Sequence, residues 1–309
     1  MAGFTAAAGS VRYIERQTGH VFEIGPQGEN PARLTNTTIP KIFDAIWSPD
    51  TSRALLRYTE NESLRTVSAT FQASTTRISP LPLTASAAFA PSPLTKLAFF
   101  VSDTSGGRVR TAESDGSRPT DILTTPFPDF LISWPDKNTL SLSSRPSGTT
   151  DGFLYSYTLD TKRLSKVAGS IPGLEVLWSP DMRRIVFSSY DTQSRLPRLS
   201  VMDIKTRAIQ DLETTAMASK CAFSVRNTNT LYCGLTTNPP AGLYPDEWLQ
   251  GALVMNDDLW KIDLTTLEKT KLGADRVFDV IRPRVSPDER FLYFVDKKNN
   301  SLWSYKLKD

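Results

Sequence analysis

Short apolar stretches separated by proline-containing turns recur along this chain of 309 residues. In three clear copies an apolar stretch leads into a Ser-Pro-Asp turn and a second apolar stretch follows it. These turns are Ser48-Pro49-Asp50, Ser179-Pro180-Asp181 and Ser286-Pro287-Asp288. Because proline fixes φ in a turn and interrupts a helix, the pattern predicts antiparallel strands rather than helices.

The aromatic residues that end the first stretch of each repeat define a period. They follow one another at intervals of about 42 to 45 residues, the period of a four-stranded propeller blade, and they are Trp47, Phe89, Trp134, Trp178 and Phe223. A third apolar strand and a more polar fourth strand follow in most repeats, as polarity suits an exposed sheet edge. We therefore predict an all-β chain, a single β-propeller over residues 1–309 with about seven four-stranded antiparallel blades.

The first and last repeats are irregular. The N-terminal repeat has strand patterns near residues 11–15, 20–24 and 32–35 but no obvious innermost strand, and the last repeat lacks an outermost one. Residues 4–8 are the candidates for one of these missing strands. The sequence leaves open how the propeller closes.

An insertion is indicated in the sixth blade, because the interval from Phe223 to Val285 exceeds the period by about 20 residues. It covers residues 237–256, between the second and third strands, and carries Tyr244, Asp246, Glu247 and Trp248. Long loops are often functional, and tyrosine and tryptophan are enriched in binding hot spots. The loop is therefore a candidate partner-binding surface, although the two rings can equally attach the loop to its own blade.

The acidic residues of the insertion and of the strand after it are Asp246, Glu247, Asp257 and Asp258. Their spacing is not that of a calcium-binding loop. We expect them to be solvated surface acids, which is the usual state of carboxylates.

A second candidate set lies three positions before the aromatic landmarks, or before Val285 in the last repeat, at the start of the innermost strands. Its members are Asp44, Ser86, Glu175, Lys220 and Arg282. We expect these side chains at the mouth of the central channel, on the face that carries the insertion. One interpretation is a site for a peptide or a small polar ligand, and the other is a ring of mutually compensating ion pairs. The ring is favoured, because the sequence does not show these polar side chains converging on one site.

Two cysteines and one histidine restrict the possible chemistry. Cys221 and Cys233 lie six residues on either side of Asn227, so a regular hairpin places them opposite each other, at a separation that suits a disulfide. The bridge requires an oxidising compartment, and the alternative is a pair of small buried apolar residues. His20 lies in a hairpin turn without a nucleophile nearby, so we predict no catalytic residue, no metal site and no cofactor.

Charge and hydropathy exclude two classes of partner. The formal net charge is +3, and the lysines and arginines are scattered, so a nucleic-acid partner is not expected. No apolar stretch reaches the length of a membrane span. Residues 1–10 do not read as an intact signal peptide, which is compatible with a leader or anchor having been removed.

The Trp-Ser-Pro-Asp turns at Trp47 and Trp178, each followed by an apolar strand, resemble those of TolB-type, WD-repeat-like β-propellers. The blades also resemble the propeller domain of the prolyl-oligopeptidase and dipeptidyl-peptidase group. Peptidases of that group need a Gly-x-Ser-x-Gly elbow and a histidine base in an attached hydrolase domain, and this chain has no such elbow. The resemblance implies a role in protein contacts, in the periplasm or at the cell surface.

We therefore expect a non-enzymatic binding or scaffolding module that recognises a protein or peptide at the cell envelope. The alternative is a propeller-class enzyme, a lyase or glycosidase, with carboxylates at the channel mouth. A glycosidase needs two carboxylates close together, whereas Asp44 and Glu175 are three blades apart in the repeat order. A third possibility is a purely architectural module of a larger assembly.

Overall fold

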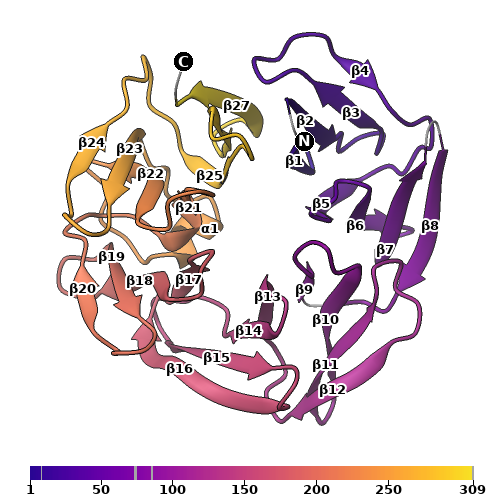
Figure 1. The fold of residues 1–309 in the computed structure, drawn as a ribbon, viewed down its shortest axis with the longest axis horizontal. Helices are drawn as coiled ribbons and strands as arrows, with labels where there is room; N and C mark the ends of the chain where they lie inside the picture. The colour runs from indigo at the N-terminus through magenta and orange to yellow at the C-terminus, as the bar shows by residue number, and fades with distance from the viewer. Residues whose placement is uncertain (8, 73–74, 85, 308–309) are drawn as a thin grey trace. The chain divides into compact units, whose positions relative to one another are not determined.

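The computed structural model describes residues 1–7, 9–72, 75–84 and 86–307, and its strands follow one another in chain order (Figure 1). The strands of the first three sheets are β1 (Gly3–Ala7), β2 (Ser10–Ile14), β3 (Val21–Ile24), β4 (Ala32–Arg33), β5 (Ile42–Trp47), β6 (Arg53–Glu60), β7 (Ser63–Gln72), β8 (Thr75–Leu81), β9 (Ser86–Phe89), β10 (Lys96–Asp103), β11 (Gly106–Glu113) and β12 (Thr120–Thr125). Those of the next two are β13 (Leu131–Asp136), β14 (Thr139–Ser143), β15 (Asp151–Thr158), β16 (Arg163–Pro172), β17 (Glu175–Trp178), β18 (Arg184–Asp191), β19 (Leu196–Asp203) and β20 (Ile209–Asp211). The last two sheets contain β21 (Cys221–Phe223), β22 (Thr230–Thr236), β23 (Asp257–Asp263), β24 (Lys269–Lys271), β25 (Val280–Val285), β26 (Phe291–Asp296) and β27 (Ser301–Lys306).

Every sheet is a meander in which strands adjacent in sequence are hydrogen-bonded neighbours. Seven successive sheets of this kind are the blades of a β-propeller, which confirms the fold class predicted from the repeats. Six sheets have four strands, and the sheet β25-β26-β27 has three within the described ranges. The N-terminal sheet takes its first strand, β1, from Gly3–Ala7. Ala8, the remaining residue of the segment suggested by the sequence, lies outside the described residues.

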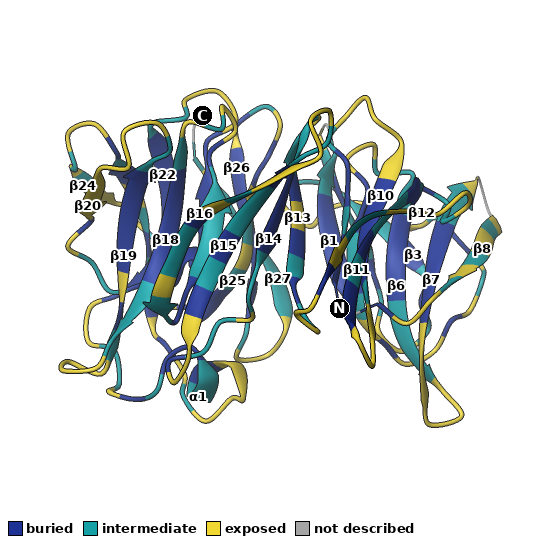
Figure 2. Ribbon diagram, turned by 90° about the horizontal axis from the view of Figure 1, so that it is seen from below, coloured by how far each residue is buried: buried dark blue, intermediate teal, exposed yellow. Residues whose placement is uncertain are grey.

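The chain divides into two compact units, Met1–Leu142 with Ser156–Leu164, and Ser143–Tyr155 with Ser165–Asp309. Within each unit, apolar side chains of neighbouring sheets pack into clusters, for example around Leu55 and Phe99 in the first unit and around Val186 and Leu231 in the second. Figure 2 shows buried residues along the middle of the strands and exposed residues in the turns. The hydrophobic core thus lies between successive sheets.

Helical structure is limited to short connections in the part of the chain that is described. The segments are η1 (Ala218–Lys220), which leads into β21, and α1 (Asp246–Leu249), which lies between β22 and β23. Neither has the length and apolar character needed to cross a bilayer, and no other described helix has them.

The Ser-Pro-Asp turns share one hydrogen-bond pattern. In each turn the serine hydroxyl donates to the aspartate two residues later and accepts the backbone N–H five residues later, at 3.0 Å from Arg53, Arg184 and Phe291. The Ser286 hydroxyl bond holds the pKa of Asp288 below its usual value. Partial burial opposes the same effect at Asp50 and Asp181, but the hydrogen bonds outweigh it and the pKa of both is lowered. This shared network explains why the motif recurs between the first two strands of a blade.

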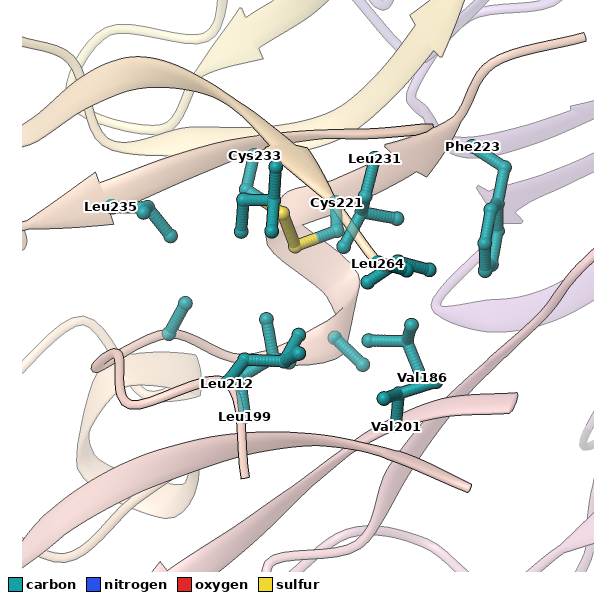
Figure 3. Packing of buried hydrophobic residues seen from close by; sticks show 13 residues of the cluster. Val186, Leu199, Val201, Leu212, Cys221, Phe223, Leu231, Cys233, Leu235 and Leu264 are labelled. Carbon is teal, nitrogen blue, oxygen red and sulfur yellow. A yellow bond between two sulfur atoms is a disulfide. The ribbon is translucent and has the colours of Figure 1, made fainter. Parts of the chain in front are cut away.

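A disulfide joins Cys221 to Cys233, with a Cα–Cα distance of 4.1 Å. The two residues are directly opposite each other in the register of β21 and β22, as the count from Asn227 predicts. Both sulfur atoms lie in an apolar cluster with side chains such as Leu199 and Leu235 (Figure 3). The bridge therefore crosslinks the first two strands of the sixth blade from inside its core.

We predict that Ser179→Ala lowers the free energy of unfolding by about 1–3 kcal/mol, because the N–H of Arg184 loses the buried Ser179 hydroxyl as its acceptor. The loss should be larger at about pH 7 than at about pH 2. The lowered pKa of Asp181 adds stability above its unfolded value, and that stability disappears as the pH falls through the folded value. Urea denaturation at the two pH values measures both effects, with the exposed hydroxyl variant Thr192→Ala as the control. An equal loss at both pH values would contradict the proposed role of Asp181.

Candidate functional site

The inserted loop, residues 237–256, connects β22 to β23 in the second unit and contains α1. Figure 2 shows α1 beyond the ends of the neighbouring strands of its unit. The loop is closed on itself by backbone hydrogen bonds, since Ala252 and Leu253 both donate to the carbonyl oxygen of Glu247. The Glu247 carboxylate accepts the N–H of Leu243 at 2.9 Å. The insertion is therefore an ordered element with its own internal bonding.

The two aromatic residues of the loop face inward. Tyr244 is 1% exposed and Trp248 is 2% exposed, and they pack with Met217 and Met255. Burial, helped by the nearby carboxylates of Asp279 and Asp257, raises the pKa of Tyr244 to about 12, and its hydroxyl donates to the carbonyl oxygen of Pro240. An exposed aromatic patch on the loop is thus not what the structure contains. Of the two interpretations left open by the sequence, the packing role describes both rings.

Lys220 lies beneath the loop in a fully buried ionic cluster. Its Nζ donates to Asp257 at 2.6 Å, to Asp279 at 2.7 Å and to the carbonyl oxygen of Val280 at 3.3 Å. The same ammonium is 4.8 Å from the centre of the Trp248 ring. The expectation that Lys220 lines an open channel mouth is wrong, because its side chain is 0% exposed.

The two carboxylates around Lys220 are satisfied by further donors. Asp257 accepts the Thr236 hydroxyl and the N–H of Val280, and Asp279 accepts the Trp248 indole N–H at 2.9 Å. Asp257 is therefore not the solvated acid expected from the sequence. The cluster joins the end of β22 and the start of β23 to the start of β25 and to the inserted loop.

A second lysine contacts the cluster through the loop backbone. Lys297 donates to the carbonyl oxygen of Trp248 at 2.5 Å and lies 4.9 Å from the centre of its ring. Desolvation lowers the pKa of Lys297, and the charge of Lys220 acts in the same direction while Asp279 opposes it. Lys220, Lys297, Asp257 and Asp279 thus form a cluster of formally balanced charge beside Trp248.

The remaining polar residues of the loop also support backbone. Asp246 accepts the Ser147 hydroxyl at 2.8 Å and the N–H of Gly148 at 2.7 Å, which connects the loop to the segment before β15. The large apolar side chains that α1 and the following residues expose are aliphatic: Leu249 is 53% exposed and Val254 is 49% exposed. The sequence did not single these two residues out.

The predicted channel-mouth residues lie at or near the start of their innermost strands, with Lys220 directly before β21, but they have different surroundings. In the first unit Asp44 on β5 pairs with Arg57 at 3.2 Å, and the Ser86 hydroxyl accepts the N–H of Ile132. In the second unit the half-buried Glu175 accepts the N–H of Ser219 at 3.0 Å. Desolvation raises the pKa of Glu175, against the opposing effects of that hydrogen bond and of Lys220.

Arg282, the last member of that set, lies at an irregularity in the pairing of β25 with β26 and has a φ of 52°. This backbone conformation is uncommon for a residue other than glycine. Groups of three or more histidine, cysteine or acidic side chains suited to a metal ion are absent from the described residues.

Asp279 is a residue of the cluster that sequence reasoning missed. It stands between Phe278 and Val280 and is 1% exposed. Acidic residues are rarely buried unless they are paired. A carboxylate between apolar residues was therefore a usable signal, but the sequence does not say which cation pairs with it.

We predict that Lys220→Met lowers the free energy of unfolding by about 3–5 kcal/mol, because two buried carboxylates lose their shared cation. Lys271→Met is the matched control: Lys271 pairs with Asp258 at 2.8 Å but is half exposed, so its loss should be about 0–1 kcal/mol. Denaturant unfolding of the two variants provides the comparison. Similar values for both would show that the buried cluster is not a major source of stability.

Comparison with known proteins gives similarity in structure only. No family model matches the chain, and no curated protein sequence matches it. Among solved structures it is similar to TolB from Acinetobacter baumannii, with 14% identity and a TM-score of 0.56 over 87% of this chain and 64% of that chain. It is also similar to an oligogalacturonate lyase in complex with manganese, with 13% identity and a TM-score of 0.65 over 99% of this chain and 96% of that chain.

The tricorn protease is a third similar structure, with 10% identity and a TM-score of 0.64. The match covers 98% of this chain but only 33% of the protease. The chain therefore spans less than two thirds of the TolB chain and about a third of the tricorn protease. At these identities the similarity shows the fold alone, and that fold is the β-propeller of TolB and other propeller proteins.

Proposed function

We propose that this chain is a non-enzymatic binding or scaffolding module that recognises a protein or peptide through its inserted loop. The observation that supports this is the division of the loop's apolar side chains between buried and exposed ones. Its aromatic side chains, Tyr244 and Trp248, are buried, while the aliphatic Leu249 and Val254 are about half exposed.

A surface of this kind is suited to binding because its conformation is fixed before a partner arrives. Side chains and loops that must be ordered on binding reduce affinity, whereas a preorganised surface avoids that cost. The buried cluster around Lys220 and the Asp246 contacts to Ser147 and Gly148 keep the loop in place. Burial of the two exposed aliphatic side chains would then contribute at roughly 25 cal/mol per Å² of apolar surface.

We further propose an extracytoplasmic location, the periplasm or the cell surface. The Cys221–Cys233 disulfide supports it, since disulfides persist in oxidising compartments. The fold similarity to TolB is compatible with the same proposal.

We predict that Leu249→Asp/Val254→Asp abolishes capture of a partner from envelope extract of the source organism and weakens binding of the purified partner at least about tenfold. Capture followed by mass spectrometry identifies the partner, and titration calorimetry measures its affinity. Val225→Asp/Ile209→Asp is the matched control, because those side chains are 48% and 59% exposed at other places in the same unit. Equal weakening by both double variants, or by neither, would remove the loop as the binding surface.

A lyase is the second candidate function, and Glu175 is the residue that favours it. A carboxyl group with a raised pKa is suited to proton transfer near neutral pH. The structural similarity to an oligogalacturonate lyase extends over 99% of the chain. In this alternative Glu175 acts as the general acid or base on an acidic polysaccharide.

If the chain is a lyase, oligogalacturonate incubated with it, with and without manganese, should yield unsaturated uronate products detectable by their ultraviolet absorbance. Glu175→Gln should then reduce the rate by about a hundredfold or more, while the exposed Glu213→Gln control retains it. Activity that depends on Glu175 would overturn the non-enzymatic proposal. Absence of product from the folded wild-type protein would eliminate this lyase candidate.

A further inference from the structure

Within the described residues, the last blade has an edge that no strand covers. Each of the other six sheets has a fourth strand beside its third one, whereas β27 is the outermost strand of the sheet β25-β26-β27 in the described ranges. In the sixth blade, for comparison, β24 pairs with β23 through Trp260↔Lys271 and the two following pairs. The edge of β27 corresponds to the edge of β23 that β24 covers.

β27 has the residues of a covered third strand but the exposure of an outer one. Leu302-Trp303-Ser304-Tyr305 repeats the pattern of Leu259-Trp260-Lys261-Ile262 in β23. Leu259 and Ile262 are 0% exposed, whereas their counterparts Leu302 and Tyr305 are only partly buried. The apolar side chains of β27 are therefore less completely buried than those of the matching strand β23.

The outward backbone groups of β27 can be identified from its register. Leu307 donates its N–H to the carbonyl oxygen of Arg290 at 2.8 Å, in line with the pairing of β26 and β27. Hydrogen-bonded pairs alternate along an antiparallel ladder, so Tyr305 and Trp303 also bond to β26. The N–H and C=O groups of Ser304 and Leu302 therefore point away from β26, toward the side on which no strand lies among the described residues.

Cationic side chains are in excess along this edge. The Arg276 guanidinium lies 4.6 Å from the centre of the Trp303 ring. Lys306 is on the strand itself, and Lys298 and Arg290 flank its two ends. Of the acids next to these cations, Glu289 and Asp296 are buried. The others are Asp275, which precedes Arg276, and Asp288, which accepts the N–H of Arg290.

We infer that the outer edge of β27 binds an extended acidic segment of a partner protein, which adds to the last blade as an antiparallel fourth strand. The other blades define the geometry of the occupant, since each third strand there has an antiparallel neighbour. The cationic edge defines its charge. A second copy of this chain fits less well, because β27 against β27 brings like charges together.

This surface is distinct from the inserted loop, so the inference does not depend on the function proposed for that loop. Main-chain hydrogen bonds supply affinity in strand addition, and alternate side chains supply specificity. The partner segment should therefore alternate acidic with apolar or β-branched residues. Its apolar side chains would cover the partly exposed Leu302 and Tyr305.

The test uses two blocked peptides of alternating sequence, glutamate with valine and lysine with valine, added to the whole chain. We expect only the glutamate peptide to bind, with an affinity that falls as salt is raised. Hydrogen exchange should show new protection at the Ser304 and Leu302 amides. Equal binding of both peptides, protection confined to other strands, or no binding of either would overturn the inference.

Ser304→Pro provides the decisive variant, because it removes an outward N–H that β26 does not use. It should weaken binding of the glutamate peptide at least about tenfold while leaving the circular dichroism spectrum and the denaturation midpoint near those of the wild type. Arg276→Glu, which keeps the backbone edge intact, should weaken it as well, whereas Lys205→Glu on a distant exposed turn should not. If Ser304→Pro left the affinity unchanged, the peptide would bind at another site and the inference would be wrong. If size-exclusion chromatography showed a dimer that this substitution dissociates, the edge would bind a second copy of this chain instead of an acidic partner.

Discussion

The arrangement of the candidate face depends on one buried ammonium group, that of Lys220. Asp257 and Asp279 both face it from the sixth and seventh blades, and neither carboxylate is more than 1% exposed. Two carboxylates left in such a place without a cation would lower the stability of the fold by about 3–5 kcal/mol, because an unpaired buried charge is costly to remove from water. With the lysine between them, the same acids accept the Trp248 indole N–H and the backbone N–H groups of Val280 and Met255. The charge cluster thus determines where the loop begins, where β25 begins and how Trp248 is oriented.

This constraint explains why the loop presents aliphatic rather than aromatic residues. Tryptophan combines a large apolar surface with one N–H donor, so it fits where an acid and an apolar core meet. Trp248 occupies such a place, with Asp279 at its nitrogen and lysine ammonium groups near its ring. Since the aromatic residues of the loop are used to attach it, contact with a partner in the proposed function would fall to Leu249 and Val254. Aromatic residues that resemble binding hot spots in a sequence can therefore pack a loop against its own domain instead of forming the exposed surface.

The repeat period, the turn chemistry and the cysteine register were predictable because each is local, involving residues within one hairpin or one blade. The burial of Lys220 and its ionic partners were not predictable. Its partners are 37 and 59 residues away in sequence, and its position before β21 specifies where it lies along the blade but not what covers it. The same reasoning applies to Tyr244: its loop position left exposure and packing equally open, whereas its burial follows from contact with segments remote in sequence such as Met217. Burial of a polar or aromatic residue outside the repeat pattern is a tertiary property, and one sequence contains no direct signal for it.

The comparison of β23 with β27 makes the same point for a whole strand. Their nearly matching apolar pattern leads to the same role, third strand of a blade, yet their exposures differ, and only β23 has a neighbour strand beyond it in the described residues. Exposed strand edges are a liability, since they pair with other chains, and charge at the edge is a common means of limiting this. Arg276 and Lys306 supply such charge, and its sign matters: repulsion between identical edges discourages self-association, whereas an acidic strand meets attraction. The feature that protects the last blade from its own copies is therefore the same one that gives it selectivity for an acidic partner.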